Sequence, residues 1–181
     1  MTYVLALAGL VTMAVFVVGT FGANLTYMNA RLMLVNLLRT NPYQVEPVSR
    51  TMQGTFFEGI AAALKTGAMV GSRDPQVIAQ GTRPAYDAAA GAAATKWKMI
   101  FGKAKLAAMA AGGSLALPVT SNKPIPLPIY FFALLTVAGL GWIWYRKNEV
   151  ESAIIRARAE ILPEVERTLI DGRYVAPPQG R

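Results

Sequence analysis

Two long stretches of the chain contain no charged side chain and consist mostly of apolar residues. They cover residues 1–30 and 124–145. A helix of about 20 consecutive apolar residues crosses a bilayer core of about 30 Å. The pattern therefore predicts two transmembrane helices, and with them an integral membrane protein.

The ends of these two stretches agree with that prediction. The first stretch begins without Lys or Arg, whereas a cleaved signal peptide has a basic start, so we expect a retained span. The second stretch ends in aromatic residues followed by cations, namely Trp142, Trp144, Tyr145, Arg146 and Lys147. Aromatic rings favour the headgroup level and cations anchor a helix just beyond it.

Between the two stretches, helical spacing is interrupted by helix-breaking residues. Residues 30–40 continue the first helix, and Asn41-Pro42 ends it, because the residue before a proline disfavours the α region. Further helices are expected from Pro47 to Gly71, from an Asp74 cap with Pro75 in first position, and from Thr82/Pro84 to Gly112-Gly113. No segment alternates as a strand does, so we predict an all-α protein.

The C-terminal part carries an amphipathic helix. Ile154 and Ile161 lie near one face of it, and Pro163 breaks it before a further helix that ends at Gly172. An apolar stripe on a helix indicates packing on a neighbour, so both isoleucines are predicted assembly contacts. The expected organisation is a first transmembrane helix (1–30), an Ala/Gly-rich helical region (31–105), a weak span with the last transmembrane helix (106–145), and an amphipathic tail with a flexible end (146–181).

The positions of Lys and Arg conflict with a chain of only two spans. Cations favour the cytoplasmic side. They follow both predicted spans: Arg31 and Arg39 the first, Arg146 and Lys147 the last. With only two spans, the cations after the first span and those after the last span would lie on opposite sides of the membrane. A third crossing over the uncharged residues 106–122 removes the conflict, and its glycines and proline require it to pack against protein. The N-terminus then lies outside, and the large middle region and the tail lie inside.

Small residues dominate the region between the spans. Residues 61–71 and 88–94 are mostly Ala and Gly. Small side chains let helices approach closely, in membranes especially. Ala also has the highest helix propensity, but the glycines in this region lower it, which favours packing as the reason. We predict a tightly bundled assembly that includes other subunits.

Two charges interrupt the apolar segment TFFEGIAAALKTGAMVG. Inside a bilayer, Glu58 and Lys65 would each cost roughly 2.5–3.5 kcal/mol. We therefore expect a cytoplasmic or interfacial helix with both charges solvated or paired across subunits. Phe56 and Phe57 are expected to touch lipid or a partner, so all four residues are predicted assembly contacts.

Composition narrows the possible functions. The net charge is +8. No basic cluster with interleaved aromatic residues suggests base stacking, so we assign the charge to a membrane surface and expect no nucleic acid. The chain has no Cys and no His, which excludes disulfides, Cys or His metal ligands and Cys or His nucleophiles. The acids Glu58, Asp74 and Asp87 form no catalytic constellation, so we expect no enzyme, cofactor or metal site.

Three segments, ARLMLVNLLRTNPYQVEP, ALLTVAGLGWIWYRKNEV and NEVESAIIRARAE, resemble parts of the MotA/TolQ/ExbB family of ion-driven motor subunits. The resemblance implies an outside N-terminus, one span, a helical cytoplasmic region, two spans joined by a short turn and a cytoplasmic helix. Residues 106–122 lack the family's usual Gly-Thr pattern, and the last span lacks its Pro and Asn. A pore position therefore carries over to Thr136 alone, whose hydroxyl could instead bond the carbonyl one turn back.

Two functions follow from these observations. The first is a non-catalytic integral membrane subunit, which forms homo-oligomers or joins other membrane subunits through small-residue helix packing. The alternative is an ion-conducting stator or energiser subunit of the MotA/TolQ/ExbB type. We expect either protein to lie in the bilayer of a bacterial inner membrane.

Overall fold

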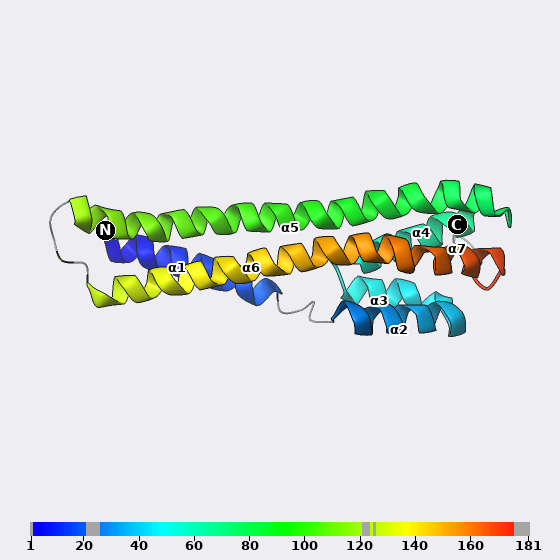
Figure 1. The fold of residues 1–181 in the computed structure, drawn as a ribbon, viewed down its shortest axis with the longest axis horizontal. Helices are drawn as coiled ribbons and strands as arrows, with labels where there is room; N and C mark the ends of the chain where they lie inside the picture. Colours follow the sequence, from blue (N-terminus) through cyan, green and yellow to red (C-terminus); the bar gives the residue numbers. More distant parts are fainter. Residues whose placement is uncertain (1, 21–25, 121–123, 125, 176–181) are drawn as a thin grey trace, which may run out of the picture. The chain divides into compact units, whose positions relative to one another are not determined.

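The computed structural model describes residues 2–20, 26–120, 124 and 126–175, and most of them are helical (Figure 1). In chain order the elements are α1 (Thr2–Thr20), α2 (Tyr27–Thr40), the 3₁₀ turn η2 (Pro42–Gln44), α3 (Val45–Thr51), α4 (Phe56–Val70), α5 (Pro75–Thr120), α6 (Leu127–Glu160) and α7 (Leu162–Ile170). No strand occurs in these ranges, which confirms the all-α prediction. The end predicted to be flexible lies outside the described residues from position 176 onward.

The helices group into two compact units. Unit 1 comprises Met1–Gly22 and Lys96–Glu149, and unit 2 comprises Ala23–Thr95 and Val150–Arg181. The two longest helices, α5 and α6, each contribute one part to each unit. The first predicted span thus packs in one unit with helices that lie about a hundred residues later in the sequence. The sequence pattern alone did not indicate this packing.

Unit 1 is formed by α1, the C-terminal part of α5 and the N-terminal part of α6. Its small core contains Met13, Ala104, Ala107 and Ile143. Gly9 lies against Ala107 and Ala111, and Met13, one turn later in α1, packs in the core with Ala104. Because later residues of α1 meet earlier residues of α5, the two helices are antiparallel. Figure 1 shows the same order, with the start of α1 beside the end of α5.

Unit 2 has the larger core, built from α2, α3, α4 and α7 with the remaining parts of α5 and α6. The largest side chains fully buried there are Leu34, Leu38, Ile60, Leu64, Ile78, Tyr86, Phe57 and Ile161. Burying one such side chain stabilises the fold by about 1.5–3 kcal/mol. Unit 2 therefore has a closely packed apolar core.

Several predicted helix ends are confirmed. The backbone N–H of Gln76 bonds the Asp74 carboxylate at 2.9 Å, so Asp74 caps α5, which begins at Pro75. Gly71 ends α4 with a left-handed φ of 66°, a conformation that costs glycine little. α7 begins at Leu162 with Pro163 in its first turn, and Gly172 follows it with φ 68°.

Four predicted helix boundaries are wrong. α1 does not run into α2, because Thr26 has an extended backbone. The helix predicted from Pro47 to Gly71 is divided into α3 and α4 by a turn in which Gly54 has φ 75°. No helix begins at Thr82/Pro84; both lie inside α5. That helix also continues past Gly112-Gly113 to Thr120.

The continuity of α5 through Pro84 has a packing explanation. A proline inside a helix removes one backbone hydrogen bond and usually breaks it. Here Thr82 and Tyr86, on either side of Pro84, are both fully buried in unit 2. Burial of these two side chains holds the helical path where the local sequence favours a break.

Two helical stretches are long and apolar enough to cross a membrane. By length and composition they are α1 and the stretch Leu127–Ile170, which begins with α6. Within the described part of the chain, the uncharged end of α5 is not among the helices that are long and apolar enough to cross a membrane. The two predicted spans therefore have suitable helices.

Candidate functional site

Close helix packing is the first feature of unit 1 that bears on function. A Cβ added at Gly9 would lie 2.9 Å from the carbonyl oxygen of Ala107 and 3.1 Å from the Cβ of Ala111. A Cβ added at Gly139 would lie 2.5 Å from the Cγ of Met13. The two glycines thus let α1 approach both α5 and α6, as small residues do between membrane helices.

All three helices of unit 1 expose large apolar side chains. The large exposed residues are Val4, Leu7, Val11, Val15 and Val18 of α1, Leu106 and Met109 of α5, and Leu127, Phe131, Leu134, Val137 and Trp144 of α6. Water-soluble monomers rarely expose apolar patches larger than a few hundred Å². Exposed apolar surface of this kind is typical of sites that contact a membrane or another protein.

Four polar side chains of unit 1 that carry no charge, Thr20, Ser114, Thr136 and Trp142, form hydrogen bonds. The indole N–H of Trp142 donates to the hydroxyl of Thr20 at 3.0 Å. The Ser114 hydroxyl donates to the Ala111 carbonyl at 2.6 Å, and the Thr136 hydroxyl donates to the Phe132 carbonyl at 2.8 Å. These pairings remove the cost of placing hydroxyl groups in an apolar interior.

The charges of unit 1 gather at one end. Its cations, apart from Lys123 in the connection between α5 and α6, are Lys96, Lys98, Lys103, Lys105, Arg146 and Lys147. Ala104 and Ile143 share one core, and α5 and α6 run in opposite directions. The lysines that precede or adjoin Ala104 and the cations after Ile143 therefore lie at the same end. The one acid of unit 1, Glu149, pairs with Arg146 there. This end therefore carries a strong positive charge.

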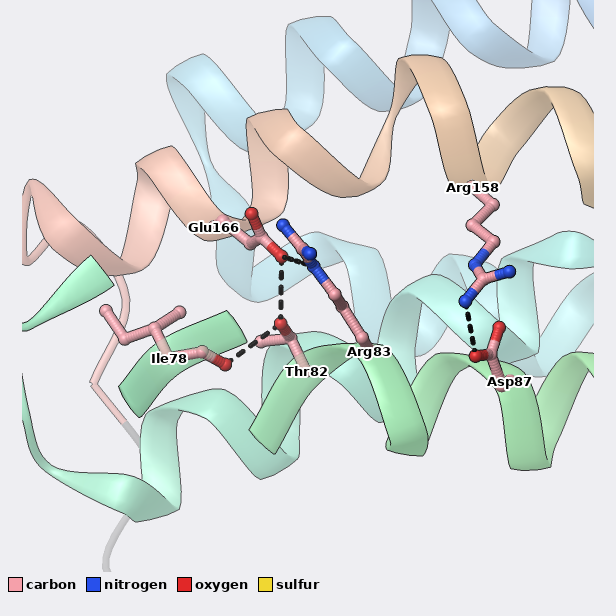
Figure 2. A network of polar contacts seen from close by, with 6 residues as sticks. All are labelled: Ile78, Thr82, Arg83, Asp87, Arg158 and Glu166. Carbon is pink, nitrogen blue, oxygen red and sulfur yellow. Dashed lines mark hydrogen bonds and ion pairs between the residues drawn. The ribbon is translucent and has the colours of Figure 1, made fainter. Parts of the chain in front are cut away.

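Ion pairs link the helices of unit 2. Figure 2 shows the Glu166 carboxylate of α7 reaching two neighbours on α5. It accepts from Nε of Arg83 at 3.0 Å and lies 3.3 Å from the Thr82 hydroxyl, which also lies 3.0 Å from the Ile78 carbonyl oxygen. The strong hydrogen bond to Glu166 raises the pKa of Arg83 further. The guanidinium thus stays charged at any pH the protein meets.

Other ion pairs repeat this pattern along α6 and α7. Arg158 of α6 bonds Asp87 of α5 at 2.8 Å (Figure 2). Glu160 pairs with Arg31 at 2.6 Å and Glu164 pairs with Arg39 at 2.8 Å, which ties α2 to the same two helices. These side chains are largely solvent-exposed, so each pair contributes about 0–1 kcal/mol and their main effect is on the register of the helices.

Tyr86 is the buried polar centre of unit 2. Its hydroxyl donates to the Ile154 carbonyl at 2.7 Å, and burial raises the pKa of its phenol. Its ring packs so closely on α4 that a Cβ added at Gly59 would lie 2.8 Å from it. A Cβ added at Gly67 would likewise come too close to the side chains of Thr82 and Leu169. Several of the small residues seen in the sequence therefore serve packing within the chain.

The predicted assembly contacts on α4 have other roles within the chain. Phe56 and Phe57 are 4% and 2% exposed and belong to the core of unit 2, so their rings are not on the surface as expected. The Glu58 carboxylate accepts from the backbone N–H of Gly54 at 2.8 Å and so holds the turn that precedes α4. Lys65 is exposed, which leaves it accessible to a partner.

The remaining predicted residues are also placed. Ile161 is fully buried in the core of unit 2, and Ile154 packs partly against that core, so their apolar stripe faces the chain itself. Thr136 is fully buried in unit 1 and bonds its own helix one turn back. That bond is the alternative expected for a span hydroxyl, and a pore role for Thr136 stays a prediction.

Sequence analysis did not identify the contacts that join the helices. Thr82 and Asp87 were considered only as a helix start and an isolated acid, whereas they bond Glu166 and Arg158 from 71 to 84 residues away. The sequence contains several Arg and Glu residues along 156–167, but their spacing does not indicate which distant residues they pair with. Within the described part of the chain, no three metal-binding side chains come together.

The sequence matches no protein-family model and no curated protein, and the fold matches no solved structure. The MotA/TolQ/ExbB resemblance therefore stays a prediction.

Proposed function

We propose that this chain is a non-catalytic integral membrane subunit of a bacterial inner membrane, which assembles with itself or with other membrane subunits. One observation carries the proposal. Unit 1 exposes large apolar side chains on all three of its helices and has its helix-borne charges at one end, whereas the surface of unit 2 carries inter-helix ion pairs among its exposed apolar side chains. A lipid environment for the first and water for the second accounts for this contrast.

The proposal includes three crossings. The end of α5 belongs to the same compact unit as α1 and α6, and Ala107 of α5 lies against Gly9 of α1. A bilayer that receives α1 and the start of α6 would then also receive the uncharged part of α5. Its glycines are tolerated because neighbouring helices cover part of its backbone.

The orientation follows from the charges of unit 1. Lysine and arginine near spans favour the cytoplasmic side. The end with Lys96, Lys98, Lys103 and Lys105 is therefore the cytoplasmic end, and the N-terminus and the turn between α5 and α6 lie outside. By chain connectivity, the residues of unit 2 are then cytoplasmic.

The surface proposed for assembly lies on α5 within unit 2. Ala88, Gly91, Ala92 and Thr95 are all exposed and uncharged. A Cβ added at Gly91 meets nothing within 4 Å, whereas those at Gly59 and Gly67 meet packed neighbours. Since small residues inside unit 2 serve close helix packing, we assign the same use, with a partner chain, to the exposed ones.

The test is the mass of the complex that the full chain forms in a mild detergent. Light scattering after size-exclusion chromatography should give a protein mass that is a multiple of 19.4 kDa, or a mass that includes other chains. Ala92→Arg should lower that mass, and Gln80→Arg, an exposed change on the same helix, should not. A wild-type protein that runs as a single chain of 19.4 kDa without partners would contradict the proposal.

A motor-type subunit is the second candidate, and the order of the helices favours it. With the crossings proposed above, α1, the cytoplasmic helices of unit 2, the end of α5, the start of α6 and the helix that leaves it follow one another in the order that the MotA/TolQ/ExbB resemblance implies. Proton or sodium flux through vesicles that hold the whole complex tests this candidate. Loss of flux in Thr136→Val with normal assembly would support it, and absence of flux in the wild-type complex would contradict it.

A further inference from the structure

One face of α5 in unit 1 combines two lysines with a strip of open backbone. Lys98, Gly102, Lys105, Met109 and Gly112 follow one another at steps of four and three residues, so they share one side of the helix. All five are exposed. The lysines lie toward the cationic end of unit 1, and Met109 and Gly112 lie toward its other end.

The two lysines are available to a ligand of opposite charge. Neither forms an ion pair with an acid in the described part of the chain. The Lys105 ammonium lies 4.7 Å from the centre of the Phe101 ring, a contact that orients it without neutralising it. Lys98 and Lys105 are seven residues apart, or about 10 Å along the helix axis, so a phosphate between them can reach both side chains.

The glycines leave room beside these lysines. A Cβ added at Gly102 or Gly112 meets nothing within 4 Å. At Gly9 and Gly139, by contrast, neighbouring helices occupy the space that a side chain would need. The exposed thioether of Met109 lies between them and continues the apolar surface. The face is therefore cationic at one end, apolar at the other, and open along its length.

We propose that this face binds an anionic phospholipid of the cytoplasmic leaflet, such as phosphatidylglycerol. Its phosphate lies over Gly102 between Lys98 and Lys105, and an acyl chain follows Met109 and Gly112. Charge complementarity selects this occupant, because a second copy of the same face would bring four unneutralised lysines together. The inference rests on the proposed placement of unit 1 in the membrane.

The experiment measures lipid selectivity of the full chain in vesicles. Spin-labelled phosphatidylglycerol and phosphatidylcholine are compared for the fraction of lipid immobilised by the protein. Lys98→Gln/Lys105→Gln should lower the preference for phosphatidylglycerol by roughly fivefold or more, since each interfacial lysine contributes on the order of 1 kcal/mol. Lys96→Gln/Lys103→Gln removes the same charge from the opposite face of α5 and should leave the preference within about twofold.

A third variant separates shape from charge. Gly102→Leu keeps both lysines and fits the fold, because nothing lies within 4 Å of its Cβ position; it should also reduce the preference. Equal losses in the two double variants, or an unchanged preference in Lys98→Gln/Lys105→Gln, would overturn the site. Resistance of each variant to alkaline carbonate extraction is measured first, because loss of wild-type protein from the vesicles would instead contradict the membrane placement.

Discussion

The indole N–H of Trp142 donates a hydrogen bond to the hydroxyl of Thr20 and thereby ties the end of α1 to α6. The Thr20 hydroxyl in turn donates a hydrogen bond to the Val17 carbonyl oxygen at 2.6 Å. Thr20 is only 3% exposed and Trp142 is partly buried, so this pair is largely shielded from water. The bond therefore fixes the register of two helices that are more than a hundred residues apart in sequence.

Removal of the acceptor should destabilise unit 1. We expect Thr20→Val to lower the free energy of unfolding by about 1–3 kcal/mol, because the indole N–H loses this acceptor in an apolar interior. Trp142→Phe/Thr20→Val should cost less than the sum of the single variants. Thermal unfolding in detergent, followed by circular dichroism, measures the cycle. Thr12→Val is the control, because the exposed Thr12 hydroxyl bonds only its own helix. If the losses of stability in the two single variants simply add up in the double variant, the expectation is contradicted.

The close approach of α1 to α5 gives a second prediction. Gly9→Leu places a side chain against the Ala107 carbonyl and should cost about 1–3 kcal/mol or more by overpacking. Gly19→Leu changes an exposed glycine on the same helix with nothing within 4 Å and should be neutral. Melting temperatures of the two variants in the same detergent measure this difference, and that of Gly9→Leu should be lower. Equal melting temperatures would mean that α1 does not pack on α5 as described.

The buried phenol of Tyr86 gives a third prediction, for unit 2. Tyr86→Phe removes the donor to the Ile154 carbonyl and should cost about 1–3 kcal/mol, since that carbonyl is left without this partner. Tyr130→Phe, at a half-exposed tyrosine of α6, is the matched control and should change little. Denaturant unfolding of both variants measures the difference. A wild-type value for Tyr86→Phe would contradict the assigned hydrogen bond.

Alkaline pH should weaken unit 2. Burial, with the neighbouring Glu160 carboxylate, raises the pKa of Tyr27 from 10.0 to about 12, and burial raises the pKa of Tyr86 as well. Between pH 10 and 12 the unfolded chain has lost these protons while the folded chain keeps them, so stability is full below pH 10 and falls as pH rises through this window.

Tyrosinate absorbance against pH, recorded on folded and unfolded protein, measures this effect. The folded wild type should show late ionisation of Tyr27, Tyr86 and Tyr174, because burial raises the pKa of each phenol, and Tyr27→Phe should lack one of these three. Seven tyrosines that all ionise near pH 10 in the folded protein would contradict the assigned burial.

Local signals in the sequence allowed accurate prediction of some features. The Asp74-Pro75 pair marks the start of α5 because an Asp cap followed by proline acts through the adjacent backbone alone. The end of α4 at Gly71 is equally local, since a left-handed residue favours glycine wherever it occurs. The helical class followed from periodicity, which is also a short-range property.

Features that depend on tertiary contacts could not be predicted in this way. Pro84 looked like a boundary because the burial of Thr82 and Tyr86, which holds α5 together there, depends on distant parts of the chain. Phe56 and Phe57 looked like contact residues because an apolar pair reads the same whether it faces a partner or the chain's own core. The pairing of Arg83 with Glu166 spans 83 residues and leaves no local pattern.

The number of crossings is the central claim, and the absence of native cysteines allows a direct test. Asn122→Cys lies between α5 and α6, and Gln76→Cys lies at the exposed start of α5. Each is treated in intact cells with a membrane-impermeant thiol reagent, before and after permeabilisation. Three crossings predict that Asn122→Cys is labelled from outside and Gln76→Cys only after permeabilisation. Labelling of both positions from the same side would contradict the third crossing and, with it, the assignment of unit 1 as a three-helix transmembrane part.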